Sequence, residues 1–356
     1  MISNWPDTSL QQASTLKDHY AGKTVCVTGG ASFIGSHLVD ALISLGSKVK
    51  VIDDLSSGSI NNLGQHKNLK IQNVDLFNTD SIMDLDGVEI LFHLAAIHGG
   101  RGFIEKNSTS LLKNLTIDFN TFNQAKEASV GAIVFASSAC AYSTDLQDST
   151  SNRQFLSEIN AGKMDSNPKP DGMYGWTKLI GEYQLEKFTE NTNIIARAAR
   201  IFTAYGDREN ESHAAIALIA KGLLKMDPYP VWGNGEQTRN FTYVSDTVTG
   251  LLSLGSDSEP GFEICNVGTD QHVTVNEFIH EVFSQLDWTP GQMHYELDKP
   301  AGVASRSSNN SHILQKYNWQ PSVDLSEGIS RTLNWYEQLS ERPKTKEALE
   351  QKLMSR

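Results

Sequence analysis

The sequence has 356 residues, of which 39% are hydrophobic and 20% are charged, a balance that is typical of a globular protein and excludes a disordered or fibrous chain. The net charge of -12 gives no basic surface for nucleic acid or for an anionic membrane, and no apolar segment approaches the length of a membrane span. Three cysteines, Cys26, Cys140 and Cys265, lie far apart without a CxxC pair, so neither a disulfide framework nor a metal site is expected.

The first predicted element is a strand in KTVCVTGG (23–30), after a polar leader at 1–20. That leader lacks the basic and apolar segments of a secretory signal, so we expect a cytoplasmic protein. SFIGSHLVDALISLG (32–46) places apolar residues at helical spacing and ends in a glycine, and KVKVIDD (48–54) is a second strand. This order of strand, turn, helix and strand predicts a doubly wound α/β sheet.

Four further apolar stretches predict strands, with helical segments between most of them: VEILFHLAA (88–96), GAIVFASSA (131–139), NIIARAARIF (193–202) and FEICNVG (262–268). Toward the C-terminus the pattern becomes mixed, with amphipathic helices predicted at 274–286 and 325–339.

We therefore expect a leader, a Rossmann domain, a smaller mixed C-terminal lobe and a charged tail. Their expected bounds are 1–20 for the leader, 21–200 with a return at 240–267 for the Rossmann domain, 201–239 and 268–340 for the lobe, and 341–356 for the tail.

The stretch TGGASFIG has the features of a dinucleotide-binding turn. Gly29 stands at the tight turn, and Gly35 stands where the helix must pack close to its strand. Asp53 follows about 20 residues later, where a carboxylate accepts hydrogen bonds from a ribose and repels a 2′-phosphate, so NAD is favoured over NADP. Asp75 and Leu76 are expected near the adenine. The helix start between the two glycines would hold the pyrophosphate, through Ser32, Phe33 and Ile34.

Four stretches, TGGASFIGSHL, HLAA, ASSACAY and YGWTK, together resemble the extended short-chain dehydrogenase/reductase family and its nucleotide-sugar epimerases. HLAAIHGGRGFIEKN, VWGNGEQTRNFTYVSD and VASRSSNN make the chain most similar to the GDP-mannose 3,5-epimerase group. The resemblance covers roughly residues 22–340. It implies an NAD-dependent isomerase with a GDP- or UDP-linked sugar as substrate, and a homodimer.

Tyr174 and Lys178 are spaced one helical turn apart, so both side chains reach the same face. A nearby ammonium favours a phenolate, so Lys178 is expected to lower the pKa of Tyr174. The tyrosine then takes a proton from a sugar hydroxyl as hydride leaves to NAD. The resemblance implies that Ser138 hydrogen-bonds the same oxygen.

A ketone at C4 of the sugar acidifies the hydrogens at C3 and C5, so a second acid/base pair can invert either centre. Cys140 fits one face of the ring if an electropositive neighbour favours its thiolate; the alternative is a small buried side chain that only packs. The family's other acid/base is a lysine, which this chain lacks. His213 in YGDRENESHAAIAL falls closest to that position, and a structural histidine near a helix start is the alternative.

The resemblance also implies the binding residues. Arg239 and Arg306 would grip the diphosphate, and Gln237 lies in the same segment as Arg239. His98, Gly99, Gly100 and Arg101 would lie along the sugar. Ala95 and His93 belong to the cofactor side, and Asn114 contacts the cofactor or lies on an ordinary helix surface. Two positions depart from the family: Ser32 replaces a glycine, and Thr203 replaces an asparagine.

Two alternatives stay open at the level of sequence. In a 4-epimerase of a UDP-hexose or UDP-hexuronate, the keto sugar rotates before it is reduced, and Cys140 only packs. A non-catalytic NAD-sensing protein is an alternative of another class. The spacing of Ser138, Tyr174 and Lys178 argues against it, because a protein that only binds does not need that arrangement.

Overall fold

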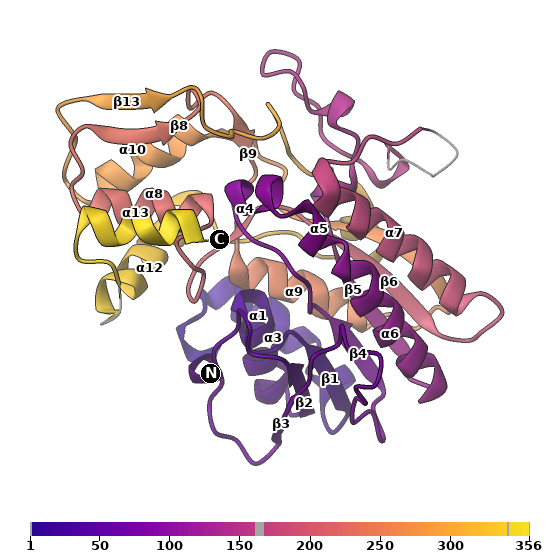
Figure 1. The fold of residues 1–356 in the computed structure, drawn as a ribbon. Coiled ribbons are helices and arrows are strands. Elements are labelled where there is room, and N and C mark those ends of the chain that lie inside the picture. Colours follow the sequence, from indigo (N-terminus) through magenta and orange to yellow (C-terminus); the bar gives the residue numbers. More distant parts are fainter. Residues whose placement is uncertain (1, 161–166, 340–341, 356) are drawn as a thin grey trace.

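Seven parallel strands form the centre of the computed structural model, which describes residues 2–160, 167–339 and 342–355 (Figure 1). Their order is β11-β6-β5-β4-β1-β2-β3, and every neighbouring pair is parallel. This order is that of a Rossmann sheet with one added strand, so the predicted doubly wound fold is confirmed. The strands are β1 (Thr24–Thr28), β2 (Lys48–Asp53), β3 (Leu69–Asn73), β4 (Ile90–His93), β5 (Ala132–Ser138), β6 (Ile195–Ile201) and β11 (Gly261–Val267).

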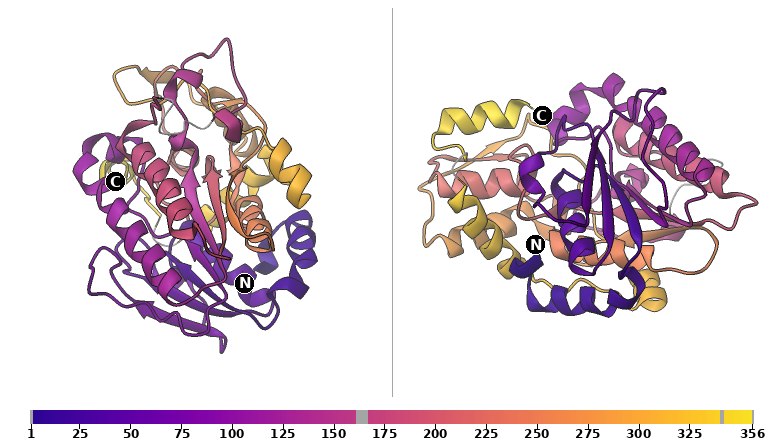
Figure 2. Two further views of the ribbon diagram at one scale, coloured as in Figure 1. Left: turned by 90° about the vertical axis from the view of Figure 1, so that its right-hand side faces the viewer. Right: turned by 90° about the horizontal axis from the view of Figure 1, so that it is seen from below.

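Helices cover both faces of this sheet (Figure 2). One face carries α6 and α7, which pack against each other; the other carries α3 and α9, with α1 and α2 outside them. The alternating side chains of β1 show why both faces of the sheet are covered. Val25 and Val27 pack in the core cluster that contains Leu38 of α3, whereas Cys26 packs in the cluster that contains Phe122 of α6. A strand that is apolar on both faces needs a cover on both.

The helices of this part are α1 (Asp7–Thr15), α2 (Lys17–Tyr20), α3 (Phe33–Ser44), α4 (Arg101–Lys106), α5 (Ser108–Leu111), α6 (Lys113–Glu127), α7 (Gly172–Thr189), α9 (Val244–Gly255) and α11 (Ser311–Tyr317). Short 3-10 turns lie at η1 (Ile2–Asn4), η2 (Ile60–Asn62), η3 (Ala139–Ala141), η4 (Thr144–Leu146) and η5 (Glu158–Asn160).

The N-terminal segment is helical and packs on the domain. The Tyr20 side chain is fully buried and donates a hydrogen bond to the Leu252 carbonyl of α9 at 2.7 Å. Ser9 and Ser245, at the start of α9, form a hydroxyl pair at 2.8 Å. The polar sequence of this segment therefore belongs to helices that cover α9 from outside.

In the part of the smaller lobe that the structure describes, four helices accompany three two-stranded pairings. Its helices are α8 (Ala214–Leu223), α10 (Val275–Gln285), α12 (Leu325–Gln338) and α13 (Lys346–Ser355). Its strand pairs are β7 (Ala204–Tyr205) with β10 (Thr242–Tyr243), β8 (Tyr229–Trp232) with β13 (Met293–Glu296), and β9 (Thr238–Arg239) with β12 (Val273–Thr274).

Local sequence signals start and anchor these helices. Thr274 and Glu277 form a capping box at the start of α10, each side chain accepting from the other residue's backbone N–H. In α13, within the segment expected to be a charged tail, Leu349 is fully buried with Ile216 and Tyr336. Among the helices described, none is both long and apolar enough to span a bilayer.

Candidate active site

The turn after β1 leaves no room for side chains at two glycines. Gly29 has a φ of +68°, and a Cβ there would lie 2.8 Å from the backbone nitrogen of Ala95. A Cβ on Gly35 would lie 2.1 Å from the carbonyl oxygen of Gly29. Ser32 stands at the N-cap position of α3, and its hydroxyl donates to the Gly29 carbonyl at 2.5 Å instead of accepting from the helix. The turn is therefore built for close backbone approach, and the serine is turned back onto it.

Asp53 ends β2 beside this turn. Its carboxylate accepts hydrogen bonds from the backbone N–H groups of Ala31, at 2.9 Å, and Leu55, at 2.8 Å. Burial raises the pKa of Asp53, and the two N–H donors act against that rise. Each oxygen keeps a further lone pair for a ribose hydroxyl.

A pocket beside Asp53 brings the predicted adenosine-side residues together: Gly29, Ser32, Asp53, Asp75, Leu76 and Ala95. Ser32 and His98 also line the larger pocket described below, as do Phe33 and Ile34. The two pockets thus meet at the helix start, which suits a molecule that extends from one into the other. The glycine turn and the N-terminus of α3 suit a pyrophosphate, and the Asp53 carboxylate suits a ribose, so the two pockets together fit a dinucleotide.

Two residues predicted to lie on the cofactor side, Asn114 and His93, are buried and do not line the two pockets. Asn114 is fully buried, and its amide both accepts from the N–H of Ile97 at 2.7 Å and donates to the Ile97 carbonyl at 2.9 Å. His93 is also fully buried, between Thr28 at 2.7 Å and Asp118 at 3.0 Å. Asn114 therefore holds the segment after β4, and His93 ties the end of β4 to β1 and α6.

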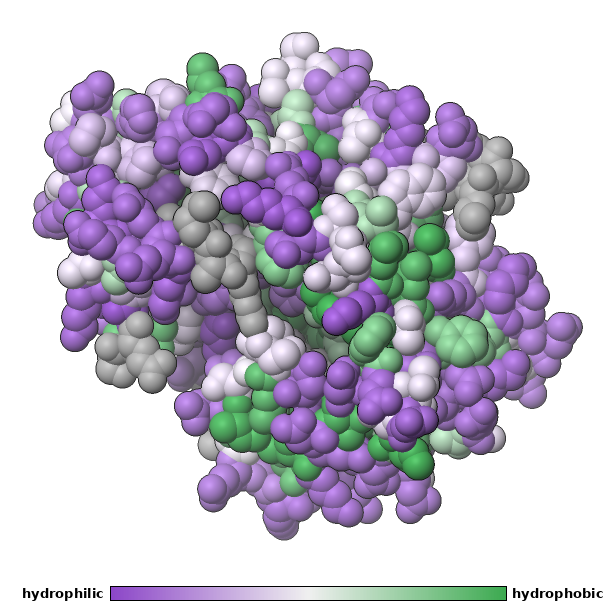
Figure 3. Space-filling view, viewed as in Figure 1, coloured by the Kyte–Doolittle hydropathy of each residue, from purple (hydrophilic) through white to green (hydrophobic). Residues whose placement is uncertain are grey.

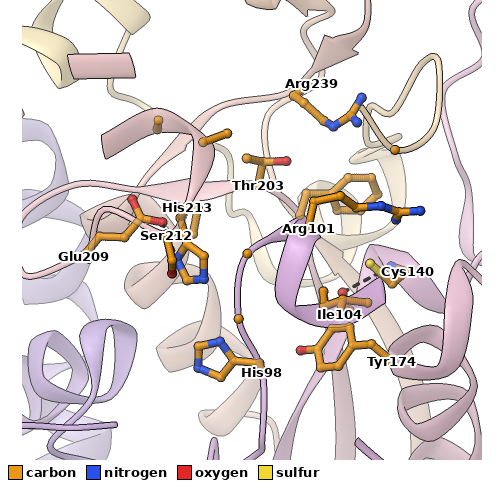
Figure 4. Close-up of a pocket in the computed structure, with 18 of the residues that line it drawn as sticks. His98, Arg101, Ile104, Cys140, Tyr174, Thr203, Glu209, Ser212, His213 and Arg239 are labelled. Carbon is orange, nitrogen blue, oxygen red and sulfur yellow. Dashed lines mark hydrogen bonds and ion pairs between the residues drawn. The ribbon is translucent and has the colours of Figure 1, made fainter. Parts of the chain in front are cut away.

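The larger pocket, of about 420 Å³, gathers the remaining predicted site residues (Figure 4). They come from the start of α4, from the end of β5 and the turn after it, from α7, from the loop after β6, from the start of α8 and from the smaller lobe. The predicted residues that line it are Gly100, Arg101, Ser138, Cys140, Tyr174, Lys178, Thr203, His213, Gln237, Arg239 and Arg306.

Helix α7 places Tyr174 and Lys178 against the end of β5. Lys178 Nζ donates to the Ala136 carbonyl at 2.8 Å and lies 5.8 Å from the centre of the Tyr174 ring. Burial raises the pKa of Tyr174 and lowers the pKa of Lys178. The prediction that Lys178 lowers the pKa of Tyr174 is therefore wrong for the protein chain by itself, because desolvation of the phenolate dominates.

Cys140 lies in a turn that a guanidinium group touches. Arg306 Nη1 donates to Cys140 Sγ at 3.2 Å, and Ser138 Oγ accepts from the Cys140 backbone N–H at 3.1 Å. Asp171 bridges two arginines: one oxygen accepts from Arg306 at 2.8 Å, the other from Arg101 at 2.7 Å. Burial alone would lower the pKa of Arg306, but Cys140 and Asp171 raise it. The electropositive neighbour that thiolate chemistry needs is thus present.

Arg239 is a cation of the pocket that hydrogen-bonds only to backbone carbonyls among the described residues. Its guanidinium donates to the carbonyls of Thr238, Val303 and Ala301, at 2.7, 2.9 and 2.9 Å. No carboxylate of the described residues forms an ion pair with it. Burial and the neighbouring Arg306 lower its pKa to about 9. A buried guanidinium held only by dipoles favours an anionic ligand.

His213 lies on the opposite side of the pocket from Cys140 (Figure 4). It stands at the N-cap position of α8. Its Nδ1 is 2.9 Å from Oε1 of Glu209, and its ring stacks on His98 with centres 5.7 Å apart. The pocket therefore presents a thiol and an imidazole from two walls, with the Tyr174 ring between them at its base.

Sequence reasoning missed Asp171 and Glu209. Asp171 stands one residue before α7, a position typical of a helix cap, so a signal existed for its place but not for its two arginine partners. Glu209 lies in a polar loop, where nothing in the sequence distinguishes it from the neighbouring Glu211.

One group of potential metal ligands lies outside the pocket. Ligand atoms of Glu263, Cys265 and His312 are within 4.8 Å of one another. Glu263 already accepts from Lys316 at 2.7 Å and from Tyr317 at 3.0 Å, which leaves its charge compensated. The expectation of a protein without a metal stays a prediction.

Comparison with known proteins agrees with this geometry. The model of the NAD dependent epimerase/dehydratase family matches residues 25–268. GDP-mannose 3,5-epimerase 1 of Oryza sativa subsp. japonica is 30% identical over 331 residues, which cover 90% of this chain and 83% of that protein.

Two solved structures are similar over most of their length. The UDP-N-acetylglucosamine 4-epimerase of Methanobrevibacter ruminantium, in complex with UDP-N-acetylmuramic acid, is 27% identical with a TM-score of 0.75, covering 89% of this chain and 99% of that one. MoeE5, in complex with UDP-glucuronic acid and NAD, is also 27% identical with a TM-score of 0.75, covering 88% and 99%. The chain is therefore an enzyme with NAD as its cofactor and belongs to the NAD-dependent epimerase/dehydratase family.

Proposed function

We propose that the protein is a nucleotide-diphosphate-sugar epimerase that inverts C3 or C5 of the sugar through a transient 4-keto form, most like a GDP-mannose 3,5-epimerase. The observation that carries this proposal is that Cys140 and His213 enter one pocket from opposite walls. Inversion at a carbon next to a ketone needs a base on one face of the ring and an acid on the other. A 4-epimerase needs only the tyrosine, the lysine and the serine.

The chain's own residues support the first step, oxidation at C4. Tyr174 is the base for the C4 hydroxyl, Ser138 hydrogen-bonds the same oxygen, and Lys178 is held on the Ala136 carbonyl beneath them. When bound, oxidised NAD supplies the hydride acceptor and a positive charge that favours the phenolate. Burial disfavours that phenolate, so the protein restricts proton loss by Tyr174 to the loaded pocket.

The inversion step then uses Cys140 and His213, which lie on opposite sides of the pocket. A thiolate at Cys140, stabilised by Arg306, removes a proton from a ring carbon, and the electron pair moves into the enolate of the 4-ketone. An imidazolium at His213 delivers a proton to the opposite face. The roles reverse in the other direction, and reduction at C4 completes the reaction.

Arg239 and Arg306 support a diphosphate as the anchor of the substrate. Both line the pocket, and Arg239 lacks a carboxylate partner among the described residues. The choice between GDP and UDP belongs to the same proposal: the 30% identical relative acts on a GDP sugar, and the two solved structures hold UDP sugars.

The decisive experiment offers GDP-mannose, UDP-glucose and UDP-glucuronate separately in D2O and follows the ring hydrogens by NMR. We expect deuterium at C3 or C5 of the GDP-linked sugar. Turnover of a UDP sugar with no deuterium on carbon would contradict the proposal and identify a UDP-sugar 4-epimerase instead.

We also propose that the protein is cytoplasmic and forms a homodimer through the face of α6 and α7. Hydrophobic side chains gather there in the space-filling view (Figure 3), and Leu112 and Phe119 are 43% and 50% exposed. Unpartnered apolar faces of this kind are typical of association sites. A solution mass of about twice the 39.3 kDa of one chain, measured by light scattering, supports the dimer; the mass of one chain contradicts it.

A further inference from the structure

Glu209 is a buried carboxylate in the loop between β7 and α8. Its side chain is 3% exposed, and Oε1 lies 2.9 Å from Nδ1 of His213. Its other oxygen, Oε2, is buried without a hydrogen-bond partner among the described residues. Burial raises the pKa of Glu209, and the contact with His213 counteracts that rise. The backbone at Gly206 also lowers the pKa, so His213 is the side chain that compensates the buried charge of Glu209.

The surroundings of His213 fix its ring. Its backbone N–H donates to the Asn210 carbonyl at 3.2 Å, which ties the residue into the loop. The ring of His98, from the segment after β4, stacks on it at an interplanar angle of 26°. With Nδ1 held by Glu209, Nε2 is the nitrogen left for the pocket, and the side chain is 22% exposed there.

We propose that Glu209 is a positioning residue, which holds the His213 ring with Nε2 toward the sugar and stabilises the imidazolium that forms during proton transfer. This inference rests on the proposed function and names a further part of the same site. When His213 acts as the base, the proton of the ring carbon moves to Nε2 and the electron pair enters the enolate of the 4-ketone. In the reverse direction Nε2 returns that proton. A carboxylate behind a histidine is a known way to set its tautomer and balance its charge.

Other charged groups near this loop are placed differently. Lys221 of α8 lines the same pocket but donates to the Pro230 carbonyl at 2.9 Å. Glu211 accepts from Tyr336 of α12 at 2.8 Å and from Lys352 of α13 at 3.1 Å, and it does not line the pocket. Glu211 is therefore a matched control for Glu209, with the same charge in the same loop.

The test compares Glu209→Gln, Glu209→Ala and Glu211→Gln with the wild type. The readouts are turnover against pH and deuterium exchange at the ring carbon. In Glu209→Gln we expect turnover to fall by roughly 10- to 100-fold, less than the full loss of an acid/base group, while exchange at the face of Cys140 continues. The limb of the profile that reports the acid/base pair should move to lower pH, because the imidazolium loses its anionic partner. His213→Lys assigns that limb, since an ammonium moves it to higher pH.

Glu209→Ala should lose more activity than Glu209→Gln, because the amide still bonds Nδ1 whereas a methyl group leaves the ring unheld. Glu211→Gln should keep both the rate and the profile, whatever it does to stability. A Glu209→Gln enzyme that is slower at all pH values with unmoved limbs would show a merely structural role and overturn the inference. A wild type without carbon exchange would instead overturn the proposed function, so the two failures are distinguishable.

Discussion

The three cysteines of this chain show how surroundings decide the chemistry of one side chain. Cys26 and Cys265 are fully buried, and burial raises the pKa of both thiols, that of Cys26 to about 12. Cys140 is half-buried, lines the pocket and receives a hydrogen bond from Arg306. Packing explains the first two, whereas a guanidinium contact at a pocket wall is what a reactive thiolate requires.

Cys140→Ala should separate the two halves of the reaction. We expect exchange of the C3 or C5 hydrogen with D2O to stop, because its base is gone, while substrate still raises the absorbance of reduced cofactor. Tyr174→Phe should lose both signals, because C4 is never oxidised, and should still bind the nucleotide sugar. Cys26→Ala is the control that removes a thiol from the core and should keep exchange. Normal turnover by Cys140→Ala would assign that residue to packing.

For single residues, the sequence predicts those that belong to a recognisable motif. It misses those whose role depends on contacts with residues far away in the sequence. Tyr174 and Lys178 are recognisable because their one-turn spacing occurs together with Ser138 and the dinucleotide-binding turn. Asp171 and Glu209 are not, because their roles depend on Arg101, Arg306 and His213, which only the fold brings near them.

Among the elements, the start of α7 organises most of the pocket. The Asp171 N–H donates to the Cys140 carbonyl at 2.8 Å, and a Cβ on Gly175 would lie 2.2 Å from that same oxygen. The Asp171 carboxylate holds Arg101 of α4 and Arg306 of the smaller lobe. One helix terminus thus fixes the thiol turn, the tyrosine and two arginines relative to one another.

Asp171→Asn should therefore lower stability and weaken nucleotide-sugar binding together. The amide keeps the shape but leaves Arg306, only 9% exposed, without its anionic partner. Breaking such a pair costs about 3–5 kcal/mol when fully buried, and since Arg101 is 31% exposed we expect roughly 2–4 kcal/mol. Urea unfolding measures the stability and calorimetry the binding.

Asp145→Asn is the matched control for that change. Its ion pair with Lys169 is more than half exposed on both sides, so removing the charge should change the unfolding free energy by about 0.5 kcal/mol or less. Equal effects of the two substitutions would show that Asp171 does not organise the pocket.

Elements with a strong apolar pattern were predictable, and the edge of the sheet was not. The strands predicted from apolar runs correspond to β1, β2, β4, β5, β6 and β11. The edge strand β3 was missed because Lys70, Ile71 and Asn73 are exposed, so its sequence carries neither a buried run nor a clear alternation. The segment of α13 was predicted to be solvated, and its packing on the lobe through Leu349 was not predictable because most of its described residues are exposed.

In the whole molecule, the pocket lies where the strand ends of the Rossmann sheet meet the smaller lobe, as is usual for open α/β sheets. The loop that leads to His213 is tied to the Rossmann domain at Asp207 and Arg208. His37 of α3 donates to the Asp207 carbonyl at 3.0 Å, and Arg208 pairs with Asp40 of α3 at 2.7 Å. Tyr243 donates to the Asp207 carboxylate at 3.3 Å. No part of this contact is visible in the sequence, because its partners are far apart along the chain.

Asp207 should make the stability of the whole molecule depend on pH. Burial raises its pKa from 3.8 to about 6, although the Tyr243 hydroxyl and Arg208 lower it. Because the folded protein prefers the protonated acid, the stabilisation is complete below the unfolded pKa and is lost as the pH rises through about 6. Asp207→Asn does not titrate, and its amide oxygen still accepts from Tyr243.

The advantage of Asp207→Asn over the wild type in unfolding free energy should therefore grow between about pH 4 and pH 7 and then level off, at roughly 1–3 kcal/mol. Thermal or urea unfolding across that range measures it. Asp270→Asn, at an exposed position, serves as the control and should stay within about 0.5 kcal/mol of the wild type at every pH. If the difference in unfolding free energy between Asp207→Asn and the wild type stays constant with pH, the Asp207 carboxylate is fully compensated in the folded protein. Burial of its charge then does not destabilise the contact between the His213 loop and the Rossmann domain.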